Sequence, residues 1–238
     1  MSAPLRPHSL SDEAHVGVSH ACSTQPPALR PAVTVPEGPI NDKWDYQRGQ
    51  YNRVYGDSNQ TIFVTTPSEF LMDCVHELPQ GPGSSAKRAI DLGAGQGRNS
   101  IPLAEAGYAV TAIDFSALGL AHLRIEAESR RLVIEILEAD ACSATLEPES
   151  VDLVVAIYIN LPEGFIDGLQ KAIKPGGAII IEGYPSDAPP CDVPLPDRFL
   201  GWQIVKYETG DAEPEWYWHG ERRAVPVVRF CACKPVKR

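Results

Sequence analysis

The chain lacks several features that would set it apart from ordinary globular proteins. Its 238 residues contain no apolar run long enough to cross a bilayer, and its beginning has no apolar stretch typical of a secretion signal. Its six cysteines form no CxxC pair and are too sparse for a disulfide scaffold. These absences predict a protein of a reducing compartment, and we expect it to be cytoplasmic.

The chain also lacks an excess of positive charge. Its 31 acidic residues outnumber its 21 Lys and Arg residues, which gives a formal net charge of -10. A nonspecific grip on nucleic-acid phosphates or on anionic lipid depends on a basic surface. We therefore expect neither nucleic acid nor a membrane as a partner.

Aromatic side chains are missing from the first 43 residues, which hold seven prolines instead. A segment that buries so little apolar surface cannot offset the entropy lost on ordering, so residues 1–43 are expected to form a disordered tail. The tail is either an extension without chemistry or a targeting or interaction arm. Aromatic residues cluster directly after it, at Trp44, Tyr46, Tyr51 and Tyr55. They mark the start of a single folded domain, residues 44–238.

The rest of the chain alternates between short apolar runs and helix-length segments. The apolar runs lie at residues 88–92, 109–113, 132–137, 151–158 and 178–182, and helical stretches at 100–106, 117–131 and 163–173 separate them. This alternation predicts right-handed βαβ units in an α/β fold, with a parallel sheet covered by helices on both faces.

A helix start precedes the first of these strands. Thr66 and Glu69 have the spacing of a capping box, and Pro67 lies at the first helical position. Apolar residues then recur at helical spacing, so one face of this helix should pack on the sheet. The helix should end near Leu78, before a cluster of turn residues.

The last forty or so residues depart from the alternation. Residues 202–207 and 225–233 have the composition of two strands with no clear helix between them. They should pair as an antiparallel hairpin at a sheet edge. Residues 185–199 hold too many prolines for a helix or a central strand, so we expect a loop there that could act as a lid.

A glycine-rich turn ends the strand at 88–92 and opens a helix. Its sequence is Asp91-Leu92-Gly93-Ala94-Gly95-Gln96-Gly97-Arg98-Asn99. Glycines let the main chain adopt positive φ and approach a ligand closely. A dinucleotide fingerprint places its third glycine five residues after the first, whereas Gly97 follows Gly93 by four. The spacing argues against a nicotinamide oxidoreductase, which remains a minor alternative.

Three acidic residues follow the ends of successive predicted strands. Asp91 would repel a pyrophosphate but suits a cationic amino group, Asp114 can accept hydrogen bonds from ribose hydroxyls, and Asp140 can reach an adenine amine. Each acid alone is equally well interpreted as a helix cap or a solvated charge. Together they lie at the crevice where open α/β sheets bind ligands. S-adenosylmethionine, which carries an ammonium and a sulfonium but no phosphate, fits this arrangement.

With these residues in view, the chain resembles the class I methyltransferases, whose first motif is an acid followed by GxGxG. Over residues 44–235 the resemblance implies a Rossmann-like, seven-stranded, mostly parallel sheet with a final antiparallel strand. It also implies S-adenosylmethionine as cofactor and a small molecule as methyl acceptor. We expect a monomer or a homodimer, between which the sequence does not decide. The cofactor-binding residues that it implies are Asp91, Gly93, Ala94, Gly95, Gly97, Asn99, Asp114, Phe115, Asp140, Ala141 and Ile157.

A narrower similarity links the chain to the small tellurite-resistance and thiopurine-type enzymes. It is carried by Trp44-Asp45 with Tyr55-Gly56, by residues 67–71 and by residues 95–99. Those enzymes act on thiols, metalloids and small heteroatom nucleophiles, and the resemblance implies such an acceptor here. The segment 216–219, Trp-Tyr-Trp-His, matches no pattern of that group, so a hydroxyl or amine acceptor also stays open.

Methyl transfer is an in-line displacement that a protein promotes mainly by positioning. A thiolate or an anionic metalloid needs no base, whereas a hydroxyl acceptor does. Tyr158 and Asn160 are predicted to line the methyl-transfer site, although a packed Tyr and a helix-capping Asn explain them equally well. His219 is the candidate base, although a surface or core histidine is the commoner case.

Three further alternatives stay open. Tyr46, Tyr51 and Tyr55 either close over the cofactor or only dock a helix. Cys231 and Cys233 would share one face of a strand, but no His or acid lies near them at ligand spacing, so no metal is expected. A noncatalytic module that keeps the cofactor fold for regulation or assembly is the main rival function.

Overall fold

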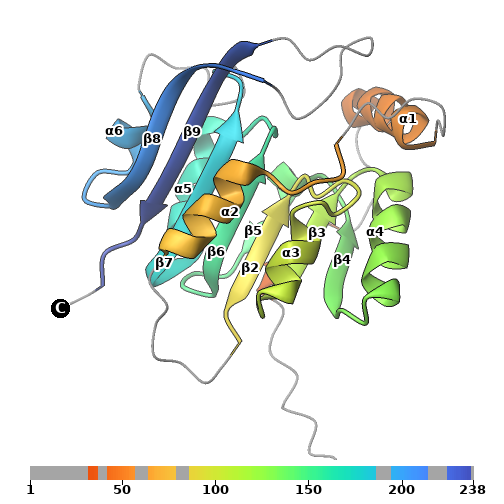
Figure 1. Cartoon of the computed structure of the whole chain (residues 1–238), viewed down its shortest axis with the longest axis horizontal. Helices are drawn as coiled ribbons and strands as arrows, with labels where there is room; N and C mark the ends of the chain where they lie inside the picture. The colour runs from red at the N-terminus through yellow and green to blue at the C-terminus, as the bar shows by residue number, and fades with distance from the viewer. Residues whose placement is uncertain are drawn as a thin grey trace, which may run out of the picture. The chain divides into compact units, whose positions relative to one another are not determined.

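The computed structural model describes residues 32–36, 42–56, 64–78, 86–185, 194–213 and 224–236. Their central feature is a seven-stranded sheet with the strand order β4-β3-β2-β6-β7-β9-β8 (Figure 1). Its strands are β2 (Arg88–Leu92), β3 (Ala109–Asp114), β4 (Ile134–Glu138), β6 (Val151–Ile157), β7 (Ile173–Gly183), β8 (Gln203–Ala212) and β9 (Val225–Cys233). The order is that of a Rossmann-like fold whose chain reverses between β2 and β6.

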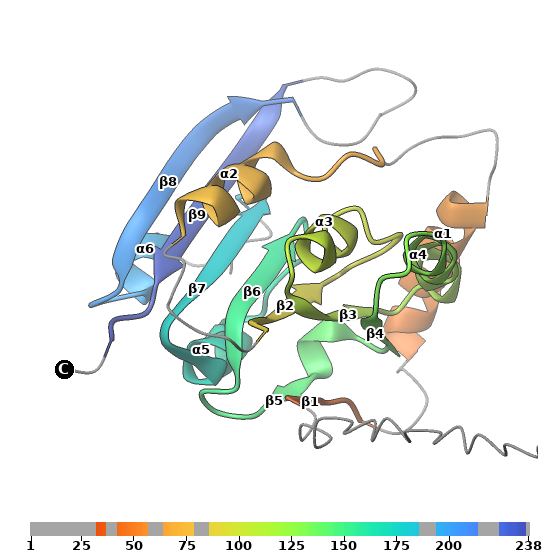
Figure 2. The same cartoon turned by 60° about the horizontal axis from the view of Figure 1, so that its bottom comes forward.

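Helices cover both faces of this sheet. On one face lie α2 (Glu69–Glu77), α3 (Ser100–Glu105) and α4 (Ala117–Ser129). The opposite face carries α5 (Glu163–Ala172), and Figure 2 shows the two layers separated by the sheet. Within the described ranges, no helix is long and apolar enough to cross a membrane. The predicted α/β fold with helices on both faces is confirmed.

Pairing directions fix where the strands end. The pairs β2–β3, β3–β4, β2–β6 and β6–β7 are parallel. Leu92 lies beside Ile113, and Asp114 lies beside Glu138, so the carboxyl ends of these strands meet at one edge. The residues that follow each strand therefore lie close together at that edge.

The carboxyl-terminal hairpin closes the sheet on the other side. β9 pairs antiparallel with both β7 and β8, which makes β8 the edge strand. The predicted antiparallel hairpin is confirmed. A short helix, α6 (Leu195–Arg198), precedes it, and Leu195 and Phe199 are buried. The expected loop at 185–199 is thus helical over one turn, since Pro196 is tolerated in a first turn; residues 186–193 lie outside the described part.

Helix α2 begins two residues later than the sequence predicts. Its N-cap is Ser68 rather than Thr66, because the Ser68 hydroxyl accepts a hydrogen bond from the Leu71 amide at 3.2 Å. The capping-box prediction is therefore wrong in register. Ser68 is fully buried and its hydroxyl also contacts Glu182, so a tertiary contact selects the cap. The expected end near Leu78, the C-cap, is confirmed.

Part of the expected tail lies in regular structure. The short strand β1 (Val33–Thr34) pairs antiparallel with β5 (Thr145–Leu146), and Ala32 and Val33 are buried. The helix α1 (Asp42–Gly56) begins before Trp44. Two small apolar side chains thus gain burial without any aromatic residue, which composition could not indicate. The remainder of residues 1–43 lies outside the described residues, so its disorder stays a prediction.

Phe230 anchors β9 in the core, and its removal tests the hairpin arrangement. The ring is fully buried, 4.9 Å from Phe199 between centroids. Phe230→Ala should lower the free energy of unfolding by about 3 to 5 kcal/mol, because it opens a cavity between packed layers. Urea denaturation measures the loss. Leu200→Ala is the control, because Leu200 is 81% exposed; equal effects of the two changes would refute the placement of β9.

Candidate cofactor and active site

The turn after β2 is held tightly to its neighbours. The amides of Gly93 and Ala94 both donate to the Ile113 carbonyl, at 2.8 and 3.0 Å. Gly95 adopts a φ of 52°, and a side chain at this position would collide with the Tyr55 hydroxyl. The requirement for glycine is therefore both conformational and steric at this point of the turn.

Asp91 lies buried beneath this turn, with 1% of its surface exposed. One carboxylate oxygen accepts a 2.5 Å hydrogen bond from the Ser100 hydroxyl. Burial raises the pKa of Asp91 to about 6, while the Ser100 hydrogen bond and Arg98 oppose the rise and Asp114 adds to it. A cation placed beside this carboxylate would stabilise its ionised form.

Asp114 joins the turn to the beginning of α4. Its two oxygens accept hydrogen bonds from the amides of Gly95, at 2.8 Å, and Ser116, at 2.7 Å. Burial raises the pKa of Asp114, and the backbone hydrogen bonds that it accepts oppose the rise. A carboxylate offers about four acceptor positions, so the side chain keeps capacity for ligand hydroxyls.

Asp140 lies at the same edge and was predicted either to cap a helix or to contact the adenine amine. One of its oxygens accepts from the Cys142 amide at 3.0 Å and caps the short helix η1 (Ala141–Ser143). The Ala139 amide donates to the Asp114 carbonyl at 2.9 Å, which holds the end of β4 beside that of β3. The helix-cap interpretation of Asp140 thus holds for one oxygen, and its proposed adenine contact stays a prediction.

Helix α1 covers the turn and the start of α4. The side chain of Tyr55 packs against Gly95 and Gly119, where any added side chain would crowd it. Burial raises the pKa of Tyr55, and the nearby Asp114 adds to this effect. The phenol therefore stays protonated at neutral pH, and its ring lies against the glycine turn and the first turn of α4.

Two further contacts fasten α1 in this position. The Tyr51 ring meets Phe115 edge-on, with 5.4 Å between centroids. The side-chain oxygen Oδ1 of Asn52 accepts hydrogen bonds from the Ser116 hydroxyl at 2.7 Å and the Leu118 amide at 3.3 Å. Tyr46 is 69% exposed. Tyr51 and Tyr55 thus contact predicted cofactor residues, whereas Tyr46 lies largely in solvent.

The predicted acceptor-side residues lie after β6, near the same edge. Tyr158 has a φ of 55°, its amide donates to the Glu182 carbonyl at 2.6 Å, and its ring packs against Tyr184. Asn160 is exposed, and its carbonyl accepts a hydrogen bond from the Cys142 thiol at 3.3 Å. The helix-cap interpretation of Asn160 is wrong, because Pro162 is the N-cap of α5. His219 lies outside the described residues.

Sequence reasoning missed a buried polar cluster that faces α2. Glu182 accepts hydrogen bonds from the Ser68 hydroxyl at 2.6 Å and from Nε of Arg229 at 2.9 Å. The Ser68 amide in turn donates to Oδ1 of Asn99 at 3.0 Å. Asn99 was predicted to bind the cofactor, yet this oxygen serves α2. The available signal was one acid inside the apolar run that forms β7.

Cysteines fill the core between α2 and β9. Cys74, Cys231 and Cys233 are buried there, and the last two share a face of β9 as their spacing predicts. A hydrogen bond with Cys74 and burial raise the pKa of the Cys231 thiol. Among the described residues, no group of three or more His, Cys, Asp or Glu side chains is placed to hold a metal ion.

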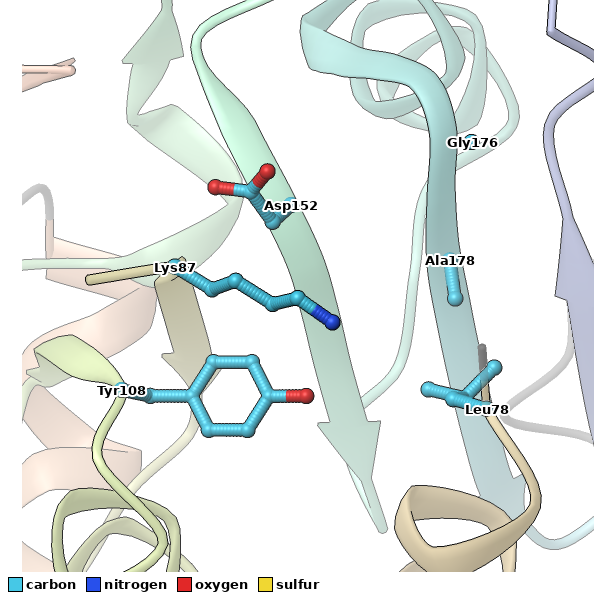
Figure 3. Close-up of a pocket in the computed structure, with 6 residues that line it drawn as sticks. All are labelled: Leu78, Lys87, Tyr108, Asp152, Gly176 and Ala178. Carbon is cyan, nitrogen blue, oxygen red and sulfur yellow. The ribbon is translucent and has the colours of Figure 1, made fainter. Parts of the chain in front are cut away.

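A small pocket lies at the amino ends of the strands, opposite the end that carries the glycine turn. Figure 3 shows Lys87 and Tyr108 pointing toward Leu78 and Ala178. Burial, together with Asp152, raises the pKa of Tyr108. The pocket lies at the amino ends of β2 and β6, so it is separate from the edge where the turn and the acids meet.

The glycine turn and the acids at the strand ends lie together at the edge where the sequence predicts a cofactor. Residues 90–181 match the family model described as a methyltransferase domain. This match supports the class I, S-adenosylmethionine-dependent methyltransferase domain that the sequence predicts. Among the proteins to which it is similar is TehB of Haemophilus influenzae.

The relatives cover only part of the chain. Hemagglutinin 1 from Eikenella corrodens is 30% identical over 137 residues, or 51% of this chain and 45% of that protein. The probable S-adenosyl-L-methionine-dependent methyltransferase TehB of Haemophilus influenzae strain 10810 is 28% identical over 142 residues, covering 53% and 49%. The chain thus spans about half the length of the curated relatives it matches.

A solved structure supports the fold. The crystal structure of TehB from Haemophilus influenzae aligns with a TM-score of 0.56 at 23% identity. The alignment covers 69% of this chain and 61% of that one. At this identity the likeness supports the arrangement of strands and helices alone.

Replacing Asp91 by Asn should stabilise the ligand-free chain near neutral pH. The pKa of Asp91 is raised from 3.8 to about 6 in the folded state. The folded state therefore binds the proton more tightly than the unfolded chain, and the free energy of unfolding falls as pH rises between those values. Above them the ionised carboxylate costs roughly 3 kcal/mol, which Asn avoids while still accepting the Ser100 hydrogen bond.

Urea denaturation of both proteins at about pH 7.5 and about pH 4 measures this difference. The gain of Asp91→Asn should be present at the higher pH and vanish at the lower one, where the native carboxyl is already protonated. Ser143→Ala, at an exposed hydroxyl on η1, is a control that should show no pH-dependent gain. A stabilisation by Asp91→Asn of the same size at both pH values would contradict the raised pKa.

Proposed function

We propose that this chain binds S-adenosylmethionine at the glycine turn and transfers its methyl group to a small-molecule nucleophile. The observation that carries the proposal is the buried Asp91 carboxylate, whose pKa is raised to about 6. Asp114 lies near enough to raise it further. Two buried acids beneath a close-packed glycine turn favour a cationic, phosphate-free ligand.

Each strand end is proposed to serve one part of that ligand. The main chain of residues 93–97 lies against it, Asp91 pairs with its ammonium, and Asp114 accepts from its ribose hydroxyls. Phe115, Ala141 and Ile157 offer apolar surface, and Asp140 is assigned to the adenine amine. Asn99 is assigned to positioning the turn through its contact with Ser68.

When bound, S-adenosylmethionine would supply a methyl carbon that its positive sulfur activates. The acceptor atom would bond to this carbon as the carbon–sulfur bond breaks, and the electron pair of that bond would stay on sulfur. The chain's own residues are proposed to orient the acceptor and exclude water. Tyr158 and Asn160 line the acceptor side, and α1 covers the cofactor side through Tyr51 and Tyr55. His219 remains the candidate base for a hydroxyl acceptor.

The acceptor class is proposed as a thiol, a metalloid anion or another small heteroatom nucleophile. A thiolate or an oxyanion is already nucleophilic when it binds. Such an acceptor needs no general base beside Tyr158 and Asn160. A hydroxyl or amine acceptor would instead depend on a base. The choice between these acceptors is made by experiment.

Calorimetry with S-adenosylhomocysteine, followed by a methyl-release screen, tests the proposal. Radiolabelled S-adenosylmethionine is offered with thiols, phenols, amines and metalloid oxyanions. We expect S-adenosylhomocysteine to bind and at least one acceptor to be methylated. Binding without methyl release to any acceptor would favour a noncatalytic regulatory module, and NADH binding without S-adenosylhomocysteine binding would revive the oxidoreductase alternative.

The affinity for S-adenosylhomocysteine should fall as the pH drops below about 6. Its ammonium pairs with ionised Asp91, whose pKa in the free protein is about 6. Below that value the carboxyl must lose a proton before pairing, so Kd should rise up to about tenfold per pH unit. Calorimetry between about pH 5 and about pH 8 measures the change. Asp91→Asn should bind more weakly and without this rise; a flat wild-type profile would count against the assignment.

A further inference from the structure

Glu182 is a buried charged residue that the proposed chemistry does not use. It lies at the carboxyl end of β7, with none of its side-chain surface exposed. Nε of Arg229 donates to one carboxylate oxygen at 2.9 Å, and the Ser68 hydroxyl donates to the other at 2.6 Å. A buried ion pair adds little net stability because desolvation offsets its attraction. Its geometry is therefore the informative property.

Ser68 connects Glu182 to the glycine turn through two hydrogen bonds. Its hydroxyl, besides donating to Glu182, accepts from the Leu71 amide and caps α2. Its amide donates to Oδ1 of Asn99 at 3.0 Å, and Asn99 is 5% exposed. Asn99 follows Gly97 by two residues and is the N-cap of α3. Glu182 is thus linked to the end of the turn through the hydroxyl and amide of Ser68 and the side chain of Asn99.

The main chain of Glu182 reaches the other half of the site. Its carbonyl accepts the Tyr158 amide at 2.6 Å, where Tyr158 holds a φ of 55°. A left-handed conformation at a non-glycine residue costs roughly 1 to 2 kcal/mol and needs support from its surroundings. Glu182 is therefore linked to the predicted acceptor side by its backbone and, through Ser68 and Asn99, to the cofactor turn by its side chain.

We propose that Glu182 is a positioning residue that sets the glycine turn relative to Tyr158 through Ser68 and Asn99. This inference rests on the proposed function, because it assigns the two halves of the site to cofactor and acceptor. Glu182 touches neither; it acts on the cofactor through the Ser68–Asn99 contact. Weakening that contact should lower cofactor affinity more than it lowers the stability of the fold.

Helix α2 offers a matched control at its other end. Lys206 forms an ion pair with Glu77 at 2.8 Å and lies 3.8 Å from Asp73. This pair also fastens α2 to the sheet, but it is remote from the turn. If Glu182 and Ser68 only held α2 in place, loosening the Lys206 end would have the same effect on ligand binding.

The test measures S-adenosylhomocysteine binding by calorimetry on the full chain, with thermal unfolding of the ligand-free proteins in parallel. The variants are Ser68→Ala, Glu182→Gln and the double substitution. Each single change should weaken binding by about tenfold, and the double change should be no weaker than the worse single change, because both break one chain of contacts. Lys206→Met should lower the unfolding temperature but leave the affinity unchanged.

Further variants keep the test decisive. Glu208→Gln, at the exposed partner 3.7 Å from Arg229, should change neither quantity. If Glu182→Gln fails to fold, Arg229→Lys keeps the charge, loses the Nε hydrogen bond and should weaken binding by about threefold. Unchanged affinity in the Ser68 and Glu182 variants, additive losses, or an equal loss in Lys206→Met would each overturn the proposal. Absence of wild-type binding would instead overturn the proposed function itself.

Discussion

The shared Ile113 carbonyl is the contact on which the site depends. Because it accepts from both Gly93 and Ala94, the turn after β2 is folded back against the end of β3. Asp114 then accepts from Gly95 and locks the next step of the turn. These main-chain contacts bring the buried Asp91 and Asp114 under one surface.

The two buried carboxylates at this edge, Glu182 and Asp91, are compensated to different degrees. Glu182 is neutralised by Arg229 and needs no ligand to complete it. Asp91 accepts hydrogen bonds from Ser100 and has Arg98 nearby, yet burial leaves its pKa raised to about 6. Charge that is incompletely compensated is a cost to folding that a cationic ligand can relieve. The contrast separates a structural carboxylate from one suited to binding.

Helix α1 illustrates how a polar helix can belong to a site. Its contacts with the domain run through Tyr51, Asn52 and Tyr55, which meet the start of α4 and the glycine turn. Few buried apolar contacts hold such an element, so it opens at lower cost than the core strands.

Strand and helix order followed from the sequence alone, because apolar runs and helical periodicity are local properties, and so did the glycine turn with its acids. The cap at Ser68, the strand at Val33–Thr34 and the roles of Asn99 and Glu182 did not follow. Each depends on partners far away along the chain: Ser68 meets Glu182 across 114 positions, and Val33 lies beside Leu146. Local pattern determined which elements form and where the turn lies. Only tertiary packing decided which polar atoms meet at that edge, since burial and pairing are set by the assembled sheet.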